Sequence, residues 1–401
     1  MDDPVLRGPA IVISLRGEDD LYREHWRVAA TVDVGRPRLA SCETFSQDMR
    51  TMKSYRAFRA AACHVSPIYF NLAATMDKAC ALIAEAARNG AALVAFPEAY
   101  LCAFPVWSGL RSPVENHDFF SSLARSSVEV PGPEIARLRA VAREHGIVVS
   151  MGLNEGTSQS IGCIWDTNII IDADGSLLNR HRKLVPTFWE KLTWANGDGS
   201  GLKVVETAIG RVGALICGEN TNPLARYALI AQGEHVHVAS YSPRWPTHPA
   251  TSNAGYDLEA AIRIRSGAHA FEGKVFCVVS SGFLSDAAAD LVCRGEPAAR
   301  TLLDSAPRSV SMIIGPSGNV ISDTLQDEEG IIYADIDIND SIVPKQFHDV
   351  SGGYNRFDVF DLQVDDRALQ PITFHQGPPL PHTGVADAGS EVAAWSGSGV
   401  E

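Results

Sequence analysis

The stretch A-L-I-C-G-E-N-T-N-P-L-A-R-Y-A-L-I-A-Q-G at residues 214–233, continued by H-V-H-V-A-S-Y at 235–241, decides the fold class. The apolar run up to Cys217 predicts a strand, the segment 223–232 predicts a helix that Gly233 ends, and the second apolar run predicts another strand. Strand, helix and strand in succession are typical of an α/β protein. This order places Cys217 at a sharp turn, with backbone N–H groups of the helix N-terminus beside its sulfur.

The same alternation extends on both sides of this stretch. Gly90 and Gly146 each follow a helical pattern that they end, and Pro133 lies in the first turn of the second of these helices. The sequence therefore predicts one α/β domain, residues 55–365, with both parallel and antiparallel strand pairs. The predicted strands are 58–65, 91–96, 147–153 and 274–281, the further helices are 71–89, 133–145 and 257–272, and the hairpins cover 168–184 and 311–322.

Both ends of the chain differ from this domain. Residues 1–54 show no sustained period and are predicted to be an N-terminal extension outside the core, with Met49 and Met52 as alternative start sites. Residues 366–401 become rich in Pro, Gly and Ser, as in G-P-P-L-P-H-T-G, and predict a flexible tail.

Composition narrows the classes of partner. The formal net charge is -14, and no Lys/Arg-rich run interrupts the acidic surface, so neither a nucleic acid nor an anionic membrane is expected to bind. We find no apolar run of about 18 residues and no signal-peptide pattern. We therefore expect a cytoplasmic protein that acts on a small molecule.

Cysteine and histidine spacing gives little support for a metal site. The eight cysteines contain no C-x-x-C pair, so most are expected to be small buried hydrophobic residues. His235 and His237 alternate along a strand and so share a face, but no third ligand with suitable spacing accompanies them. A packed, hydrogen-bonded pair is the preferred interpretation.

Three polar residues follow apolar strands, where sites of α/β proteins are usually built. They are Glu98, Lys183 and Cys217. Taken alone, each residue could have a purely structural role. Glu98 could be a salt-bridged carboxylate, Lys183 a solvated cation and Cys217 a core cysteine. A glutamate at the end of an apolar strand is nevertheless costly unless it is paired or titrates usefully.

The motifs around these residues resemble, in order and at matching separations, those of the nitrilase branch of the carbon–nitrogen hydrolases. They are F-P-E-A at 96–99, H-R-K-L-V-P-T at 181–187 and C-G-E-N-T-N-P-L-A-R-Y at 217–227. The resemblance covers about residues 57–362. It implies a four-layer α-β-β-α sandwich in a single domain, and a homo-oligomer: a dimer that extends into spirals in some members of the family.

The resemblance also implies a role for each motif residue. Cys217 is expected to be the nucleophile, Glu98 the general base and Lys183 the cation that stabilises the tetrahedral intermediate. Glu190, in P-T-F-W-E, matches the second glutamate of the family, which orients the lysine and the water. A thiolate suits a weakly electrophilic nitrile carbon, and a nearby Lys⁺ lowers the thiol pKa. Neither a metal nor an organic cofactor is needed for hydrolysis to the carboxylic acid and ammonia.

The sequence is less informative about the substrate pocket. Many nitrilases have Trp directly after the cysteine, whereas this chain has Gly218, which is expected to widen or reshape the pocket. Trp107, Tyr241 and Trp245 follow predicted strands and are candidates for its walls, with loop packing as the alternative. Aromatic walls would favour an aryl or arylalkyl nitrile.

Two other functions remain open at this point. An amidase or carbamoylase of the same superfamily would use the same four residues on an amide. A non-catalytic assembly protein would keep the fold, although the intact set of Glu98, Lys183, Glu190 and Cys217 argues against it.

Overall fold

The run F-R-A-A-A-C-H forms the strand β1 (Phe58–His64), which lies inside a sheet of six strands in the order β11-β1-β2-β3-β4-β5. The computed structural model describes residues 55–252, 255–370 and 372, so the predictions for 1–54 lie outside it. Parallel pairs join β1 to β2 and β2 to β3, and the remaining neighbours are antiparallel. The other strands of this sheet are β2 (Ala91–Ala95), β3 (Val148–Glu155), β4 (Trp165–Ile171), β5 (Leu177–Arg182) and β11 (Gly330–Ile336).

A second sheet has the order β10-β9-β8-β7-β6. Its central strands β7, β8 and β9 are parallel, and the short strands β6 and β10 add to its edges in antiparallel fashion. The strands are β6 (Val205–Thr207), β7 (Gly210–Ile216), β8 (Val236–Tyr241), β9 (Phe276–Ser281) and β10 (Met312–Ile314). The mixed α/β class expected from the alternation of elements is therefore confirmed.

Local signals explain where the long helices begin and end. In α2 (Leu72–Arg88), the Asn71 side chain accepts a hydrogen bond from the Ala74 N–H, and Gly90 follows with φ 82°. In α4 (Pro133–His145), proline opens the first turn and Gly146 adopts φ 61° at the end. The helix α5 (Pro223–Ala231) begins after Asn222, and α6 (Leu258–Gly273) begins after Asp257.

Several short elements were not expected from the sequence. They are too short for their apolar residues to show a clear helical or strand period. One of them is a strand at the edge of the first sheet, because residues 330–336 form β11 against β1. The unexpected helices are α3 (His117–Arg125), α7 (Asp286–Cys293), α8 (Pro297–Ser305) and α9 (Ile342–Phe347).

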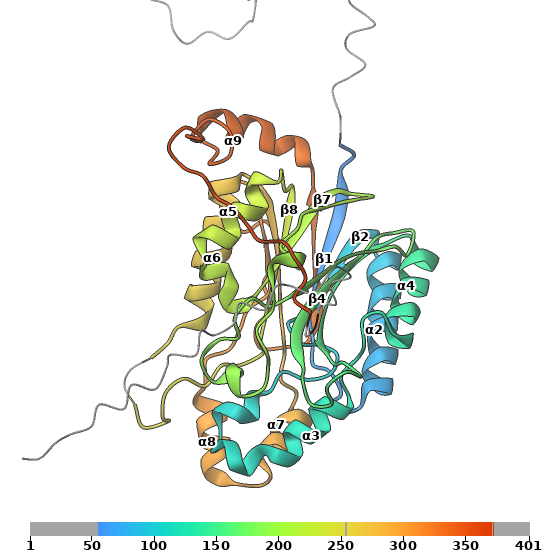
Figure 1. Ribbon diagram of the computed structural model, residues 1–401, viewed down its shortest axis with the longest axis vertical. Helices are drawn as coiled ribbons and strands as arrows, with labels where there is room; N and C mark the ends of the chain where they lie inside the picture. Colours follow the sequence, from blue (N-terminus) through green and yellow to red (C-terminus); the bar gives the residue numbers. More distant parts are fainter. Residues whose placement is uncertain (1–54, 253–254, 371, 373–401) are drawn as a thin grey trace, which may run out of the picture. The chain divides into compact units, whose positions relative to one another are not determined.

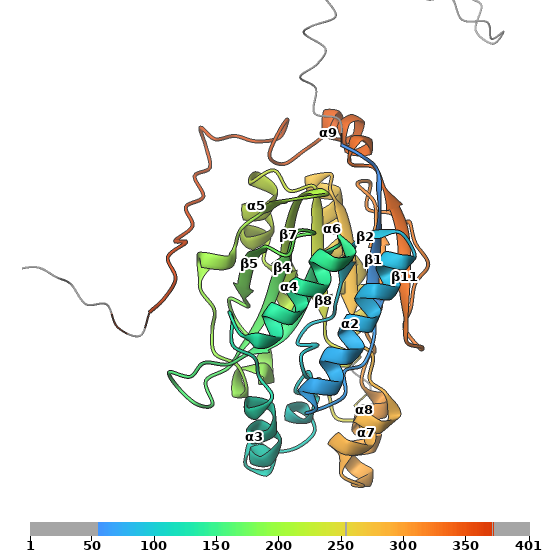
Figure 2. The same cartoon turned by 90° about the vertical axis from the view of Figure 1, so that its right-hand side faces the viewer.

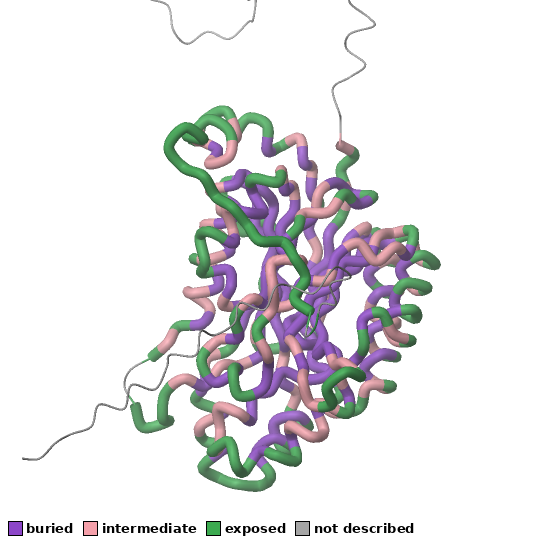
Figure 3. The backbone as a smooth tube through the Cα atoms, viewed as in Figure 1, coloured by how far each residue is buried: buried purple, intermediate pink, exposed green. Residues whose placement is uncertain are grey.

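The two sheets face each other and helices cover their outer faces. Figure 1 shows α2 and α4 on one side and α5 and α6 on the other, and Figure 2 shows α2 and α4 side by side over the first sheet. Apolar residues of both sheets, such as Ala62, Leu93 and Val238, form the cluster between them. Figure 3 shows buried positions running through the strands and exposed positions on the outer helix faces. These layers confirm the predicted α-β-β-α sandwich.

Some predictions about the chain as a whole remain predictions. The proposed tail, 366–401, lies mostly outside the described residues, although the Leu369 N–H donates to Asp198 Oδ2 at 2.9 Å. Within the described residues, no helix has both the length and the apolarity required to cross a bilayer. The oligomer and the cytoplasmic location stay predictions.

Ala62 tests how tightly the two sheets pack, because it is 0% exposed and belongs to the cluster between them. Ala62→Leu should lower the free energy of unfolding by about 1–3 kcal/mol because the extra methyl groups have no room. Urea-induced unfolding measures this change. Ala57→Leu, on the exposed segment before β1, is the matched control and should stay near wild type. Equal midpoints for the two variants would contradict the packing described for the two sheets.

Candidate active site

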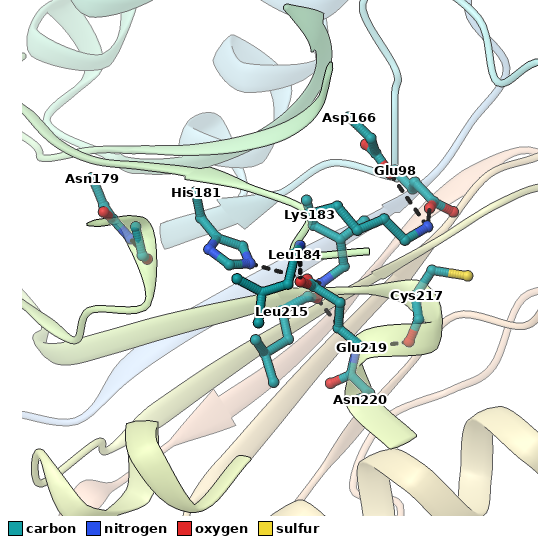
Figure 4. Close-up of polar contacts among 12 residues, drawn as sticks. Glu98, Asp166, Asn179, His181, Lys183, Leu184, Leu215, Cys217, Glu219 and Asn220 are labelled. Atoms are coloured by element: carbon teal, nitrogen blue, oxygen red, sulfur yellow. Dashed lines mark hydrogen bonds and ion pairs between the residues drawn. The ribbon is translucent and has the colours of Figure 1, made fainter. Parts of the chain in front are cut away.

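The candidate site lies where β2, β5 and β7 end. Because β4 is antiparallel to both β3 and β5, strands β2, β3 and β5 all point in the same direction. Glu98 follows β2, Lys183 comes directly after β5, and Cys217 comes directly after β7 of the second sheet. Figure 4 shows that these three side chains converge from different loops.

The ammonium group of Lys183 is the centre of the site. Its Nζ donates to Glu98 Oε1 at 2.6 Å and to Glu190 Oε2 at 2.6 Å, and all three side chains are 0–1% exposed. Burial favours the neutral amine, but the attraction of Glu190 and Glu98 outweighs it and raises the pKa of Lys183 well above its usual value. Lys183 therefore stays charged.

Cys217 joins this cluster from the turn after β7. One ligand atom from each of Cys217, Glu98 and Glu190 lies within 4.8 Å of the other two. The residue adopts φ 50°, a left-handed conformation that is costly for a residue with a side chain and is often found at functional sites. The sharp turn expected from the sequence is thus present, at the start of a short 3-10 helix, Cys217–Thr221, just before α5.

Lys183 lowers the pKa of the Cys217 thiol, as expected, but burial outweighs this effect. Burial and the negative charge of Glu98 raise the pKa of Cys217 well above its usual value, although Lys183 acts in the opposite direction. The lysine alone therefore does not make a thiolate. A base must remove the proton, and Glu98 is close to the sulfur.

The two glutamates titrate far above the range of exposed carboxyl groups. Burial raises the pKa of Glu98 to about 8 against the attraction of Lys183. Burial likewise raises the pKa of Glu190 to about 7, and Lys183 opposes the rise. Groups with such pKa values accept and return protons near neutral pH, as acid–base catalysis requires.

Glu219 joins the cysteine loop to the lysine loop. Its Oε2 accepts from the Ile216 N–H at 2.9 Å and bonds to His181 Nε2 at 3.0 Å, while Oε1 accepts from the Leu184 N–H at 2.5 Å. Burial favours the neutral acid, yet His181 and these N–H groups keep the pKa of Glu219 below its usual value. The carboxylate thus connects the residue before Cys217 to the residue after Lys183 (Figure 4).

A second buried chain of hydrogen bonds holds the turn that contains Cys217. Asn220 Nδ2 donates to the carbonyl oxygen of Cys217 at 3.1 Å, and its Oδ1 bonds to His237 Nε2 at 2.9 Å. Glu234 then bonds to His237 Nδ1 at 2.8 Å and to His269 Nε2 at 2.6 Å. Burial opposes ionisation, but the two histidines lower the pKa of Glu234 to about 2.

This arrangement corrects the expected pairing of His235, which directly precedes β8, with His237 in β8. The ring of His235 lies 4.6 Å from that of Tyr55, and its Nδ1 accepts from the Arg211 N–H. The ring of His237 instead stacks on His269 at 3.7 Å. Glu234 and His269, which lie outside β8 and show no ligand spacing in the sequence, come within 4.8 Å of His237. Both histidines are hydrogen-bonded to Glu234.

The predicted pocket residues fall into two neighbouring apolar clusters. Tyr241 and Trp245 belong to the cluster that contains Cys217. Trp107 belongs to the next one, where its ring lies 5.3 Å from both Phe70 and Phe119. Trp245 also contacts this second cluster and so joins the two. The structure therefore places Tyr241 and Trp245 with the nucleophile, and Trp107 farther along the same aromatic region.

Gly218 is needed for a close approach of two loops. A Cβ atom there would lie 2.5 Å from Thr187 Oγ1, so a larger residue would displace the Thr187 side chain. Gly218 and the 184–188 loop line a cavity of about 310 Å³. Glycine thus allows the loop after Lys183 to pack directly on the turn of Cys217.

Sequence reasoning missed two charged residues near the nucleophile. Asp166 in β4 lies 3.4 Å from Lys183 Nζ. Arg265 in α6 donates to Tyr256 Oη, and its positive charge opposes the rise in the thiol pKa of Cys217. The sequence contains one signal for Asp166, because aspartate is uncommon inside a strand such as W-D-T-N-I-I-I.

Comparison with known proteins gives a consistent result. The model of the carbon–nitrogen hydrolase family matches residues 59–343. A nitrilase of Paraburkholderia phymatum is 35% identical over 321 residues, which are 80% of this chain and 90% of the relative. An aliphatic nitrilase of Rhodococcus rhodochrous is 34% identical over 344 residues, 84% of this chain and 92% of the relative.

Similarity to a solved structure supports the fold but says nothing about the function. A carbon–nitrogen hydrolase from Helicobacter pylori superposes with a TM-score of 0.58 at 18% identity. The match covers 76% of this chain and 97% of that protein.

His235 and His237 provide a matched test of the hydrogen bonds that connect Glu234 to Asn220, because only His237 takes part in them. His237→Leu should lower the free energy of unfolding by about 2–4 kcal/mol because Glu234 loses a buried partner. It should also lower kcat more than it changes KM, because Asn220 no longer holds the Cys217 carbonyl in place. Urea-induced unfolding and steady-state kinetics measure the two effects. His235→Leu should change stability by no more than about 1 kcal/mol, and an equal loss in both variants would refute the special role of His237.

Proposed function

The chain belongs to the carbon–nitrogen hydrolase family, and we propose from this premise that it is a nitrilase, converting an organic nitrile into the carboxylic acid and ammonia. The family match confirms the resemblance drawn from the three motifs. The observation that carries the proposal is the buried cluster in which Lys183 joins Glu98 and Glu190 beside Cys217.

The first half of the proposed reaction makes a covalent thioimidate. Glu98 accepts the thiol proton as the sulfur of Cys217 attacks the nitrile carbon, and the proton passes to the nitrile nitrogen. The C–S bond forms as one π bond of the nitrile breaks. Deprotonation by Glu98 is required because the thiol is protonated at rest.

The second half releases both products. Water, deprotonated by Glu98, adds to the thioimidate and gives a tetrahedral intermediate whose negative charge Lys183 stabilises. The C–N bond breaks as the nitrogen is protonated, ammonia leaves, and a thioester remains. A second water, again activated by Glu98, releases the acid and regenerates the thiol. Glu190 holds Lys183 in position throughout.

The aromatic side chains near Cys217 favour a substrate with an aryl group. Tyr241 and Trp245 share its apolar cluster, and the ring of Tyr256 lies 5.6 Å from that of Trp245. Aromatic walls bind a planar ring through a large apolar contact and favourable edge-to-face geometry. We therefore propose an aryl or arylalkyl nitrile in preference to a short aliphatic one.

Ammonia release from a panel of nitriles tests the proposed activity. Wild type should release ammonia from at least one aryl, arylacetic or aliphatic nitrile, and faster from the aromatic ones. Cys217→Ala should reduce this rate by about a thousandfold or more because the covalent route is lost. Cys277→Ala, at another buried cysteine, is the matched control and should remain active.

Each other outcome would point to a different function. Turnover of amides but no nitrile, dependent on Cys217, would make the protein an amidase. Inertness to both, with Cys217 also unreactive toward an alkylating agent, would favour a non-catalytic assembly protein.

The pH dependence of kcat/KM tests the assignment of Glu98. The carboxylate form is the active base, so the rate should rise with pH and level off above an inflection near the Glu98 pKa of about 8. Below this inflection the base is protonated and the rate falls. An acid limb near about pH 4.3, the value of an exposed glutamate, would contradict the assignment.

A further inference from the structure

A third acidic side chain, that of Asp166, completes the cluster around Lys183. Asp166 is the second residue of β4, and its backbone carbonyl accepts from the Lys183 N–H at 2.8 Å. Residues directly opposite on antiparallel strands place their side chains on the same face. Asp166 Oδ2 accordingly lies 3.4 Å from Lys183 Nζ, and Figure 4 shows the Asp166 carboxyl group beside that of Glu98. None of the three sequence motifs includes Asp166.

The charges of this cluster do not balance without an additional proton. One ammonium group faces three carboxyl groups, all at most 2% exposed. Within the described part of the chain, no group donates a hydrogen bond to Glu98 Oε2, Glu190 Oε1 or either oxygen of Asp166. Ionising all three buried carboxyl groups against one cation would leave these oxygens without compensation, which is strongly disfavoured, so the cluster retains a proton.

Glu98 and Asp166 meet at the same ammonium group, since Lys183 Nζ lies 2.6 Å from Glu98 Oε1 and 3.4 Å from Asp166 Oδ2. Burial and then the negative charge of Asp166 raise the pKa of Glu98 to about 8, and burial raises the pKa of Asp166 to about 6. Two neighbouring carboxyl groups that share one proton titrate as a pair. The remaining charged groups facing the pair are Lys183, Glu190 and, more weakly, Glu219.

We propose that Asp166 is a positioning residue that shares a proton with Glu98 and thereby directs the tetrahedral intermediate toward the acid instead of the amide. This proposal rests on the nitrilase function proposed above. Asp166 acts only through Glu98, which contacts the reacting atoms.

The chemistry follows from the two ways in which the tetrahedral intermediate can collapse. Its carbon carries the Cys217 sulfur, an NH₂ group and an oxyanion, and Glu98 holds the proton that it took from the water. If Glu98 donates this proton to the nitrogen, the C–N bond breaks, ammonia leaves and the oxyanion forms the carbonyl of the thioester. If the nitrogen stays unprotonated, the oxyanion forms the carbonyl of an amide, the C–S bond breaks instead, and the departing thiolate takes the proton of Glu98. A glutamate that holds its proton at neutral pH favours the first route.

Asp166→Asn separates a proton-sharing role from a structural one. Asparagine has the shape of a protonated aspartate and donates an N–H to Glu98, so the fold should be retained. It removes the neighbouring negative charge, and Glu98 should therefore lose its proton at lower pH. We expect the acid limb of kcat/KM to move down by about one pH unit or more, and the amide share of the product to rise about threefold or more.

The control is Asp172→Asn, directly after the other end of β4. Asp172 accepts from the N–H groups of Ala173 and Ala208 and should behave as wild type in both measurements. An active Asp166→Asn variant with an unchanged pH profile and product ratio would overturn the proposal. Asp166→Glu, which restores a carboxyl group, should return the pH profile toward wild type.

Two measurements keep this test independent of the substrate assignment and of folding. If wild type hydrolyses amides but no nitrile, the proposed function fails, and the pH profile of amide hydrolysis still tests Asp166. If Asp166→Asn does not fold, infrared spectroscopy of wild type decides. A protonated carboxyl band at neutral pH that disappears at alkaline pH supports the shared proton, and its absence at neutral pH overturns it.

Discussion

The buried ammonium group of Lys183 is the interaction on which the rest of the site depends. It binds two carboxylates at 2.6 Å, and all three side chains are buried. Without this cation, Glu98 and Glu190 would lose their partner and neutralise. With it, they remain next to the thiol of Cys217, with pKa values near neutrality. The same cation is placed to stabilise negative charge that develops on the substrate.

The surrounding fold holds this cluster in place. Lys183 and Cys217 come from different sheets, so their separation depends on how the two sheets pack. Glu219 bridges the two loops, and Asn220 connects the cysteine loop to the buried Glu234 network. Most of these partners are polar groups with no exposure to solvent, which makes their geometry rigid when they are satisfied. Preorganisation of this kind is what electrostatic catalysis needs.

Periodicity and motif order predict much of this arrangement, and tertiary contacts account for what they leave out. Caps such as Asn71, Gly90 and Gly146 mark the ends of helices locally, and they appear where the sequence predicts them. The short helix α7 and the edge strand β11 depend on distant partners and have no comparable signal. Asp166 meets Glu98 only because β2, β3 and β4 pair in the correct register, and His269 meets Glu234 only because α6 packs close to the start of β8. The net rise in the Cys217 pKa also depends on burial that a motif does not encode.

The central claim is that Cys217 forms a covalent intermediate with a nitrile, and mass spectrometry of the quenched enzyme tests it directly. The enzyme is mixed with an arylacetonitrile, quenched in acid during turnover and digested. The peptide containing Cys217 should carry the added mass of a thioimidate or thioester, and the other cysteine peptides should be unmodified. An unmodified Cys217 peptide during active turnover, or an adduct on a different cysteine, would contradict this claim.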